Sequence, residues 1–206
     1  DHPVVVELFQ SQGCSSCPPA NANLSRIADR PDIVALSFAV TYWDRLGWKD
    51  RFATPAHSER QWDYAHAANR SQVWTPQFII NGTDTIVGVR REQFDATIAA
   101  ARGVTGGPAI EAREGAVTIA AAPAAAPATV WLVRYDPREQ AVAISAGEND
   151  GRTLPHRNIV RSLDNLGSWD GDAVRFAVPA GVDPALRTAI LVQQGRGGPI
   201  IAARKL

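Results

Sequence analysis

The two cysteines of the chain, Cys14 and Cys17, are separated by two serines, and the sequence holds no other cysteine. They follow a short β-branched run, Val4–Phe9, that is typical of a buried strand. They precede a segment with apolar residues at helical spacing, Ala20–Ala28. We therefore expect the pair on a strand-to-helix turn, where the positive end of the helix favours a thiolate. This context predicts accessible sulfurs and thiol–disulfide exchange.

Three alternatives to redox exchange stay open for the cysteine pair. A purely structural disulfide is one, although so small a ring would add only modest stability. Structural zinc is another, and it would need two more ligands. Histidines could supply them, but none stands at a recognisable ligand spacing: His2, His57, His66 and His156. The third alternative is that the spacing is accidental.

Composition and charge exclude several classes of function. The 206 residues include 21 basic and 21 acidic side chains, so we expect no nucleic-acid partner and no general attraction to an anionic membrane. The longest uncharged stretch, residues 115–133, is rich in alanine and interrupted by prolines, so no membrane span is expected. Since Asp1 is followed almost at once by a strand, any targeting segment is expected to have been removed or not included.

Apolar runs and turn signals predict an alternation of elements in the first half. After the first strand and helix we expect a strand at 33–40, a helix at 54–69, a strand from Pro76 to Ile80, a returning strand at 85–89 and a helix at 91–102. The predicted order is β-α-β-α-β-β-α. It is complete by about residue 103.

A glycine- and proline-rich segment at 103–108 predicts a linker between two domains, 1–105 and 106–206. The second half contains short apolar or alternating runs separated by turns, which are typical of an all-β sandwich. One segment of it, 154–166, has apolar residues at helical spacing and predicts a short helix.

Four stretches of the chain resemble a family of secreted bacterial proteins of unknown function with a thioredoxin-like fold. They contain Cys-Ser-Ser-Cys-Pro-Pro, Tyr-Trp-Asp, Trp-Thr-Pro-Gln and Gly-Glu-Asn, and they lie at residues 6–19, 42–50, 74–77 and 147–158. The resemblance implies a thioredoxin-like core followed by a sandwich-like domain, and a periplasmic or secreted location. It does not name a substrate. Where an acidic residue is expected before Tyr-Trp-Asp, this chain has Thr41.

Within this resemblance, the cysteines and Glu7 receive catalytic roles. Cys14 is expected to attack and Cys17 to resolve the mixed disulfide. Glu7 interrupts an apolar strand before the cysteines, where thioredoxin-like oxidoreductases often carry a buried carboxylate, and it could accept a proton from Cys17. The alternative is that Glu7 lies at a solvated edge or pairs with an arginine.

Substrate-binding roles are predicted for residues on two loops. The Thr75–Pro76 bond is expected to be cis and to face the cysteines, which would leave the Thr75 backbone free to pair with an extended substrate. A trans proline on an edge strand is the alternative. Trp43 and Trp48, in the aromatic loop 41–52, could form the wall of a substrate groove, or they could seal the junction with the second half.

The charge-dense segment 148–161 has two interpretations. His156 could approach the cysteines and stabilise a thiolate. Alternatively, the segment forms a structural ion-pair network or a domain interface with these charged residues: Glu148, Arg152, Arg157 and Arg161.

Together these features predict an exported thiol–disulfide oxidoreductase without cofactor or metal, whose partner is a protein or small-molecule disulfide or dithiol. The alternative is a binding module on the same scaffold that captures copper or a partner protein without redox turnover. A distant histidine would then complete the copper site: His57, His66 or His156. The chain contains no methionine, a common soft copper ligand, and its cysteine spacing is the redox one.

Overall fold

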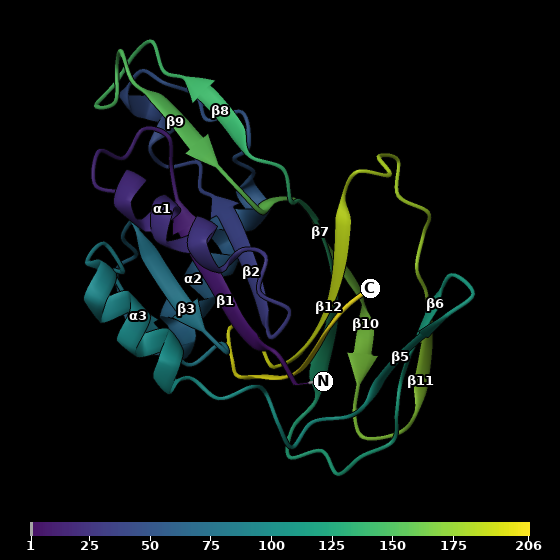
Figure 1. Cartoon of the computed structure of the whole chain (residues 1–206). Helices are drawn as coiled ribbons and strands as arrows, with labels where there is room; N and C mark the ends of the chain where they lie inside the picture. The colour runs from purple at the N-terminus through teal and green to yellow at the C-terminus, as the bar shows by residue number, and fades with distance from the viewer. Residues whose placement is uncertain (1) are drawn as a thin grey trace.

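The first half of the chain forms the helix-covered part of a large sheet, shown in Figure 1 from a computed structural model that describes residues 2–206. Its strands and helices alternate as follows: β1 (Val4–Gln10), α1 (Pro18–Ile27), β2 (Ile33–Ala39), α2 (Pro55–Ala67), β3 (Gln77–Ile80), β4 (Asp84–Ile86) and α3 (Arg91–Ala100). A short 3₁₀ helix, η1 (Asp44–Leu46), lies in the loop between β2 and α2. This is the order of elements that the apolar runs predict.

The central strands β1 and β2 are buried along their whole length because helices cover both faces. They pair in parallel, with Val6 opposite Ala35 and Phe9 opposite Phe38. Val6 and Leu8 of β1 pack against α1 and α3. Alternate residues of the same strand point to the other face, where Phe9 packs near α2.

The second half, residues 106–206, contains strands and turns only. Its strands are β5 (Ile110–Arg113), β6 (Ala116–Ile119), β7 (Ala128–Asp136), β8 (Gln140–Ala143), β9 (Thr153–His156), β10 (Ile159–Trp169), β11 (Val174–Ala177), β12 (Arg187–Gln194) and β13 (Ile200–Lys205). Three of them form a small sheet in the order β11-β6-β5, and β8 pairs with β9 in a two-stranded ribbon near α1 (Figure 1).

One sheet of eight strands runs through both halves, in the order β13-β12-β7-β10-β2-β1-β3-β4. The join is made by β10 and β2, which pair in parallel at Ile159 and Ser37. The backbone N–H of Ser37 donates to the carbonyl of Asn158 over 2.9 Å. The irregular segment 101–109 separates α3 from β5, but the main sheet does not stop there.

The short helix predicted at 154–166 is wrong, because this segment forms β9 and most of β10. The physical reason is the irregular register between β10 and β7, which shifts at Val160/Ser162 and again at Asn165/Gly167. Each shift breaks the two-residue alternation of a strand. The apolar residues of β10 therefore fall at intervals that imitate a helix.

The Thr75–Pro76 peptide bond is cis and lies at the entrance of β3. Among the described residues, no helix combines the length and the apolar character needed to cross a membrane.

Asn158 holds the join between the two halves, and its replacement should destabilise the whole sheet. Its buried amide donates to the carbonyls of Ala28 and Ala35, and its φ is 51°, a conformation that favours asparagine or glycine. We expect Asn158→Ala to lower the free energy of unfolding in urea by about 2–3 kcal/mol. Glycine adopts a positive φ without strain, whereas alanine does not. Asn158→Gly should therefore lower the free energy of unfolding by about 1 kcal/mol less than Asn158→Ala does. A loss below about 0.5 kcal/mol in both variants would contradict this role.

Candidate functional site: a covered disulfide at the start of a helix

Cys14 and Cys17 form a disulfide at the N-terminus of α1, on the turn that follows β1. The backbone N–H of Cys14 donates to the carbonyl of Ser11, and that of Cys17 donates to the carbonyl of Cys14. Cys17 is the N-cap residue of α1, and two prolines follow it. The turn therefore lies where the sequence places it.

The predicted accessibility of the sulfurs is wrong in this structure. Cys14 and Cys17 each have a relative exposure of 0%, although Ser15 and Ser16 between them are exposed. The reason is that two segments far apart in the sequence cover the turn. One is the aromatic loop 41–52, and the other is the turn 147–152 of the second half.

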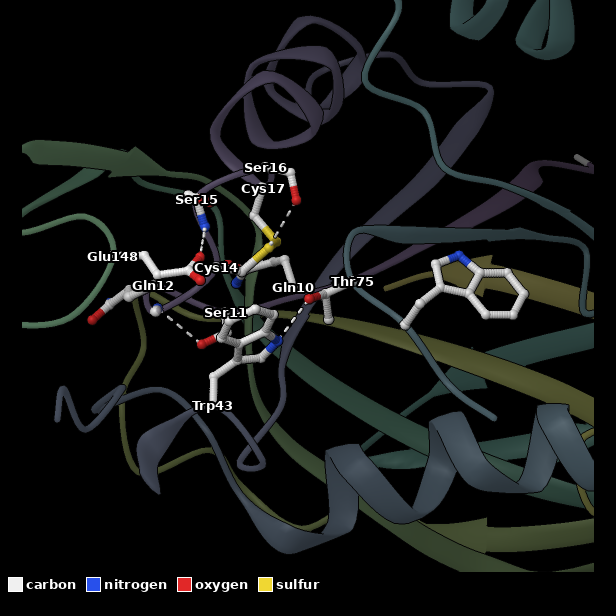
Figure 2. The surroundings of a disulfide bond; sticks show 12 residues. Gln10, Ser11, Gln12, Cys14, Ser15, Ser16, Cys17, Trp43, Thr75 and Glu148 are labelled. Atoms are coloured by element: carbon white, nitrogen blue, oxygen red, sulfur yellow. Dashed lines mark hydrogen bonds between the residues drawn. A yellow bond between two sulfur atoms is a disulfide. The ribbon is translucent and has the colours of Figure 1, made fainter. Parts of the chain in front are cut away.

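The aromatic loop covers the turn through two tryptophans and an aspartate. Trp43 Nε1 donates to Thr75 Oγ1 over 2.8 Å, and Figure 2 shows these two side chains beside the disulfide. The Trp43 Cβ lies so close to Gly13 that a Cβ added to that glycine would be 3.2 Å away. The loop thus links the cysteine turn to the cis Thr75–Pro76 segment.

Trp48 and Asp50 fix Gln12, which precedes Gly13 in the turn. Trp48 Nε1 donates to Gln12 Oε1 over 2.8 Å, and Asp50 Oδ2 accepts from the Gln12 backbone N–H over 2.9 Å. Burial raises the pKa of Asp50, while its two backbone N–H donors oppose that rise. Trp48 also lies against Gly147 of the second half, so it stands at the junction of the two covering segments.

The second covering segment binds the cysteine turn by its backbone. Asn149 is fully buried, and its Nδ2 donates to the carbonyls of Gln12 and Cys14 over 2.8 and 2.9 Å. Arg152 Nη1 donates to Asn149 Oδ1 and orients the amide. Sequence reasoning assigned no role to Asn149 itself, and the signal that could have pointed to it is the Gly-Glu-Asn motif in which it stands. The glycine of that motif has a φ of 77° and forms a tight turn.

Glu148 contacts Ser15, the first of the two serines between the cysteines. Its Oε2 accepts a hydrogen bond from the backbone N–H of Ser15 over 3.0 Å, as the dashed line in Figure 2 shows. Hydrogen bonds from the side chain and then the backbone of Ser15 lower the pKa of Glu148. An ionised carboxylate of the second half therefore lies one residue from Cys14.

Glu7 is buried in a polar network with α2 and β12. Its carboxylate accepts from Arg60 Nε over 2.6 Å and from the hydroxyl of Tyr64. Gln193 accepts from Arg60 and donates to the Tyr64 hydroxyl. Burial raises the pKa of Tyr64 well above its ordinary value. Glu7 thus pairs with an arginine, and among the described residues none of its side-chain hydrogen bonds goes to a cysteine.

The histidines lie in separate places. His57 Nδ1 is 2.9 Å from the Ala39 carbonyl oxygen, whereas His66 lies on the exposed side of α2 beside Trp62. His156 is buried edge-on against Phe52, and within residues 2–206 neither ring nitrogen has a hydrogen-bond partner. Across residues 2–206, no group of three or more potential ligands stands together as a metal site.

A groove of about 430 Å³ lies next to Trp43. It is bounded by the aromatic loop, by α2 and by the segment just before the cis Thr75–Pro76 bond. Its lining residues are Tyr42, Trp43, Arg45, Leu46, Trp62, Ser71, Gln72 and Val73. The groove therefore runs along the two segments that the Trp43–Thr75 hydrogen bond joins.

The profile of a family described as a protein of unknown function (DUF1223) matches residues 5–193. The chain belongs to the DUF1223 family. This confirms the resemblance at the level of a family of unknown function. Among curated proteins, none matches this chain.

Two solved structures are similar to this DUF1223 chain. A protein from Agrobacterium tumefaciens, determined by X-ray crystallography, is 32% identical, with a TM-score of 0.78 over 98% of this chain and 93% of that one. HBP35 of Porphyromonas gingivalis is 13% identical, with a TM-score of 0.64 over 99% of this chain and 74% of that one. The second likeness concerns the fold alone.

Burial of His156 should make the stability of the protein depend on pH. Burial lowers the pKa of His156 from 6.5 to about 4. Between these two pH values the unfolded chain therefore binds a proton that the folded chain does not bind. Stability is therefore lost as the pH falls from 6.5 towards 4, by about 3 kcal/mol for this group. His156→Leu should remove that share of the loss, measured by urea unfolding across this range.

His66→Leu, on the exposed side of α2, serves as the control for replacing a histidine by leucine. Burial also lowers the pKa of His57 to about 4, so part of the slope should remain in His156→Leu. A slope equal to that of the wild type would contradict the contribution of His156.

Breaking the Trp43–Thr75 hydrogen bond should expose the disulfide more often. Thr75→Val removes the acceptor and keeps the β-branched shape. The free energy needed to open the loop over the disulfide should fall by about 1 kcal/mol. We therefore expect dithiothreitol to reduce the disulfide about fivefold faster. Free thiols measured over time give this rate. Thr85→Val, which removes a hydroxyl bonded within the β3–β4 hairpin, is the matched control. Equal rates in all three proteins would contradict the closing role of this bond.

Proposed function

We propose that this protein is an exported thiol–disulfide oxidoreductase, built on a thioredoxin-like core, that exchanges disulfides through Cys14 and Cys17. The observation that carries the proposal is the disulfide itself, at the N-terminus of α1 and beside the segment with the cis Thr75–Pro76 bond. Its partner is a disulfide or dithiol of a protein or small molecule. The exported location, periplasmic or secreted, follows from the family resemblance.

The chemistry needs no group beyond the two dithiols. A substrate thiolate attacks Cys14 Sγ, the bond to Cys17 breaks, and Cys17 leaves as a thiolate that takes up a proton. The second substrate thiolate attacks the mixed disulfide and releases Cys14. Two electrons and two protons pass from substrate to protein, and the reverse sequence returns them.

Burial of the pair adds one requirement, which is a local opening of the cover. The groove beside Trp43 and the backbone of Thr75 are the surfaces on which an extended substrate would lie once Trp43 moves. Trp48 stays with Gln12 and the second half in this proposal, so it supports the turn from behind. Local openings of this kind cost less than global unfolding.

Glu7 remains a proposed acceptor for the Cys17 proton, with a restriction that its contacts impose. Its carboxylate is paired with buried Arg60, so Glu7→Gln also leaves an unpaired buried charge and should destabilise the fold by about 3–5 kcal/mol. The informative measurement is therefore the pH dependence of mixed-disulfide resolution. An unchanged pH profile in a folded Glu7→Gln protein would exclude this role.

Trapping of intermediates tests the proposed function. The wild type should catalyse reduction of insulin by a dithiol, whereas Cys14→Ser should lose this activity completely. Cys17→Ser should retain attack and accumulate a mixed disulfide with the substrate, seen by mass spectrometry, because the resolving thiol is absent. Both variants lose the same disulfide, so each is the stability control of the other.

The copper alternative is measured on the same three proteins by Cu(I) titration. Tight Cu(I) binding without disulfide exchange in the wild type would replace the proposed function. If the wild type shows neither disulfide exchange nor Cu(I) binding, the disulfide is a structural one and the proposed function is wrong.

A further inference from the structure

We infer that Glu148 lowers the reduction potential of the Cys14–Cys17 couple, so that the reduced protein donates electrons to substrate disulfides. This inference rests on the proposed function and names the direction of electron flow at the same site. A couple is a strong oxidant when its reduced form is stabilised, and the usual source of that stabilisation is a favoured thiolate. In this chain, three features of the turn disfavour a thiolate at Cys14.

The first feature is the start of the helix. Pro18 and Pro19 occupy the first two positions of α1, and proline has no backbone N–H. The Cys17 N–H donates to the Cys14 carbonyl. The helix end therefore offers a thiolate at Cys14 fewer backbone donors than an N-terminus normally does. A side-chain donor is left, because the Ser16 hydroxyl lies 3.5 Å from Cys14 Sγ (Figure 2).

The second feature is Glu148, which occupies a remaining donor. The Ser15 N–H, next to Cys14 in the chain, is bonded to Glu148 Oε2 over 3.0 Å. The carboxylate also brings a negative charge to this place, and a like charge disfavours the thiolate. Figure 2 shows the Glu148 side chain reaching the turn between the two cysteines from the second half.

The third feature is the burial of both cysteines, which favours the neutral thiol over the thiolate. The remaining charged groups close to the turn do not compensate. Asp50 adds a carboxylate on Gln12, and Arg152 directs its guanidinium to Asn149 rather than to a sulfur. Glu148 is the member of this group that is bonded to a residue between the cysteines, so it is the one whose removal should act on Cys14.

The redox step that Glu148 biases is balanced by thiols alone. Reduced protein gives two electrons and two protons to a substrate disulfide, and it returns as the Cys14–Cys17 disulfide while the substrate becomes a dithiol. A separate dithiol reductant then restores the reduced protein. Destabilising the Cys14 thiolate raises the free energy of the reduced form, so this transfer becomes more favourable.

Glu148→Gln is the decisive variant because its amide oxygen still accepts from Ser15 while the charge is gone. We expect the thiolate fraction of the reduced protein, followed by ultraviolet absorbance during a pH titration, to be about fivefold larger near neutral pH. In equilibrium with glutathione, the variant should shift towards reduced protein by about fivefold at alkaline pH and hardly at all at acidic pH, where both proteins carry neutral thiols.

Asp150→Asn is the matched control, because it removes a charge from the same exposed turn. Among residues 2–206, the Asp150 side chain makes no hydrogen bond to the cysteine turn. It should shift the titration clearly less than Glu148→Gln. Coincident titrations of the wild type and Glu148→Gln would overturn the inference, as would equal shifts in the two variants. These readouts do not require turnover, so a wild type that titrates as expected but reduces no substrate would count against the proposed function alone.

Discussion

The buried amide of Asn149 is the contact on which the rest of the site depends. It donates to the backbone carbonyls of Gln12 and Cys14, so it fixes the cysteine turn by groups that no side-chain substitution in the turn can remove. A buried carbonyl left without a donor would cost about 1–3 kcal/mol. The second half of the chain is therefore part of the site, and the position of Asn149 also brings Glu148 to Ser15.

The same arrangement explains why one sheet joins the two halves. The turn 147–152 precedes β9 and β10 in the chain, and β10 is anchored beside β2 by the hydrogen bond between Ser37 and Asn158. The ribbon of β8 and β9 leads into and out of the turn and packs near α1. Cysteine turn, covering turn and sheet join thus form one continuous set of contacts.

Local patterns predicted the first half well, because they report on residues that are close in sequence. The apolar run before Cys14 and the helical spacing after it define the turn, and the loop with Trp43 and Trp48 is placed correctly. What sequence reasoning could not supply are contacts between distant segments. Asn149 lies far along the chain from Cys14, and no periodicity connects them. The burial of the sulfurs follows from such contacts, made by the aromatic loop and by the turn 147–152, so it was missed as well.

One further error has a physical cause of its own, and for Glu7 the sequence left two alternatives open. Irregular pairing of β10 with β7 spreads its apolar residues at intervals that resemble a helix, so a strand was taken for a helix. For Glu7, a polar residue in an apolar strand signals a buried partner but does not identify it. The partner is Arg60 of α2, on the face where Tyr64 also packs.

The central claim is that the covered disulfide reacts in the folded protein through a local opening. It is tested most directly by the rate of its reduction by a dithiol as urea is added in steps below the unfolding transition. Local opening exposes little surface, so the account predicts a rate that hardly changes with urea. A rate that rises with the full urea dependence of global unfolding would contradict it, because the disulfide would then react only in the unfolded chain.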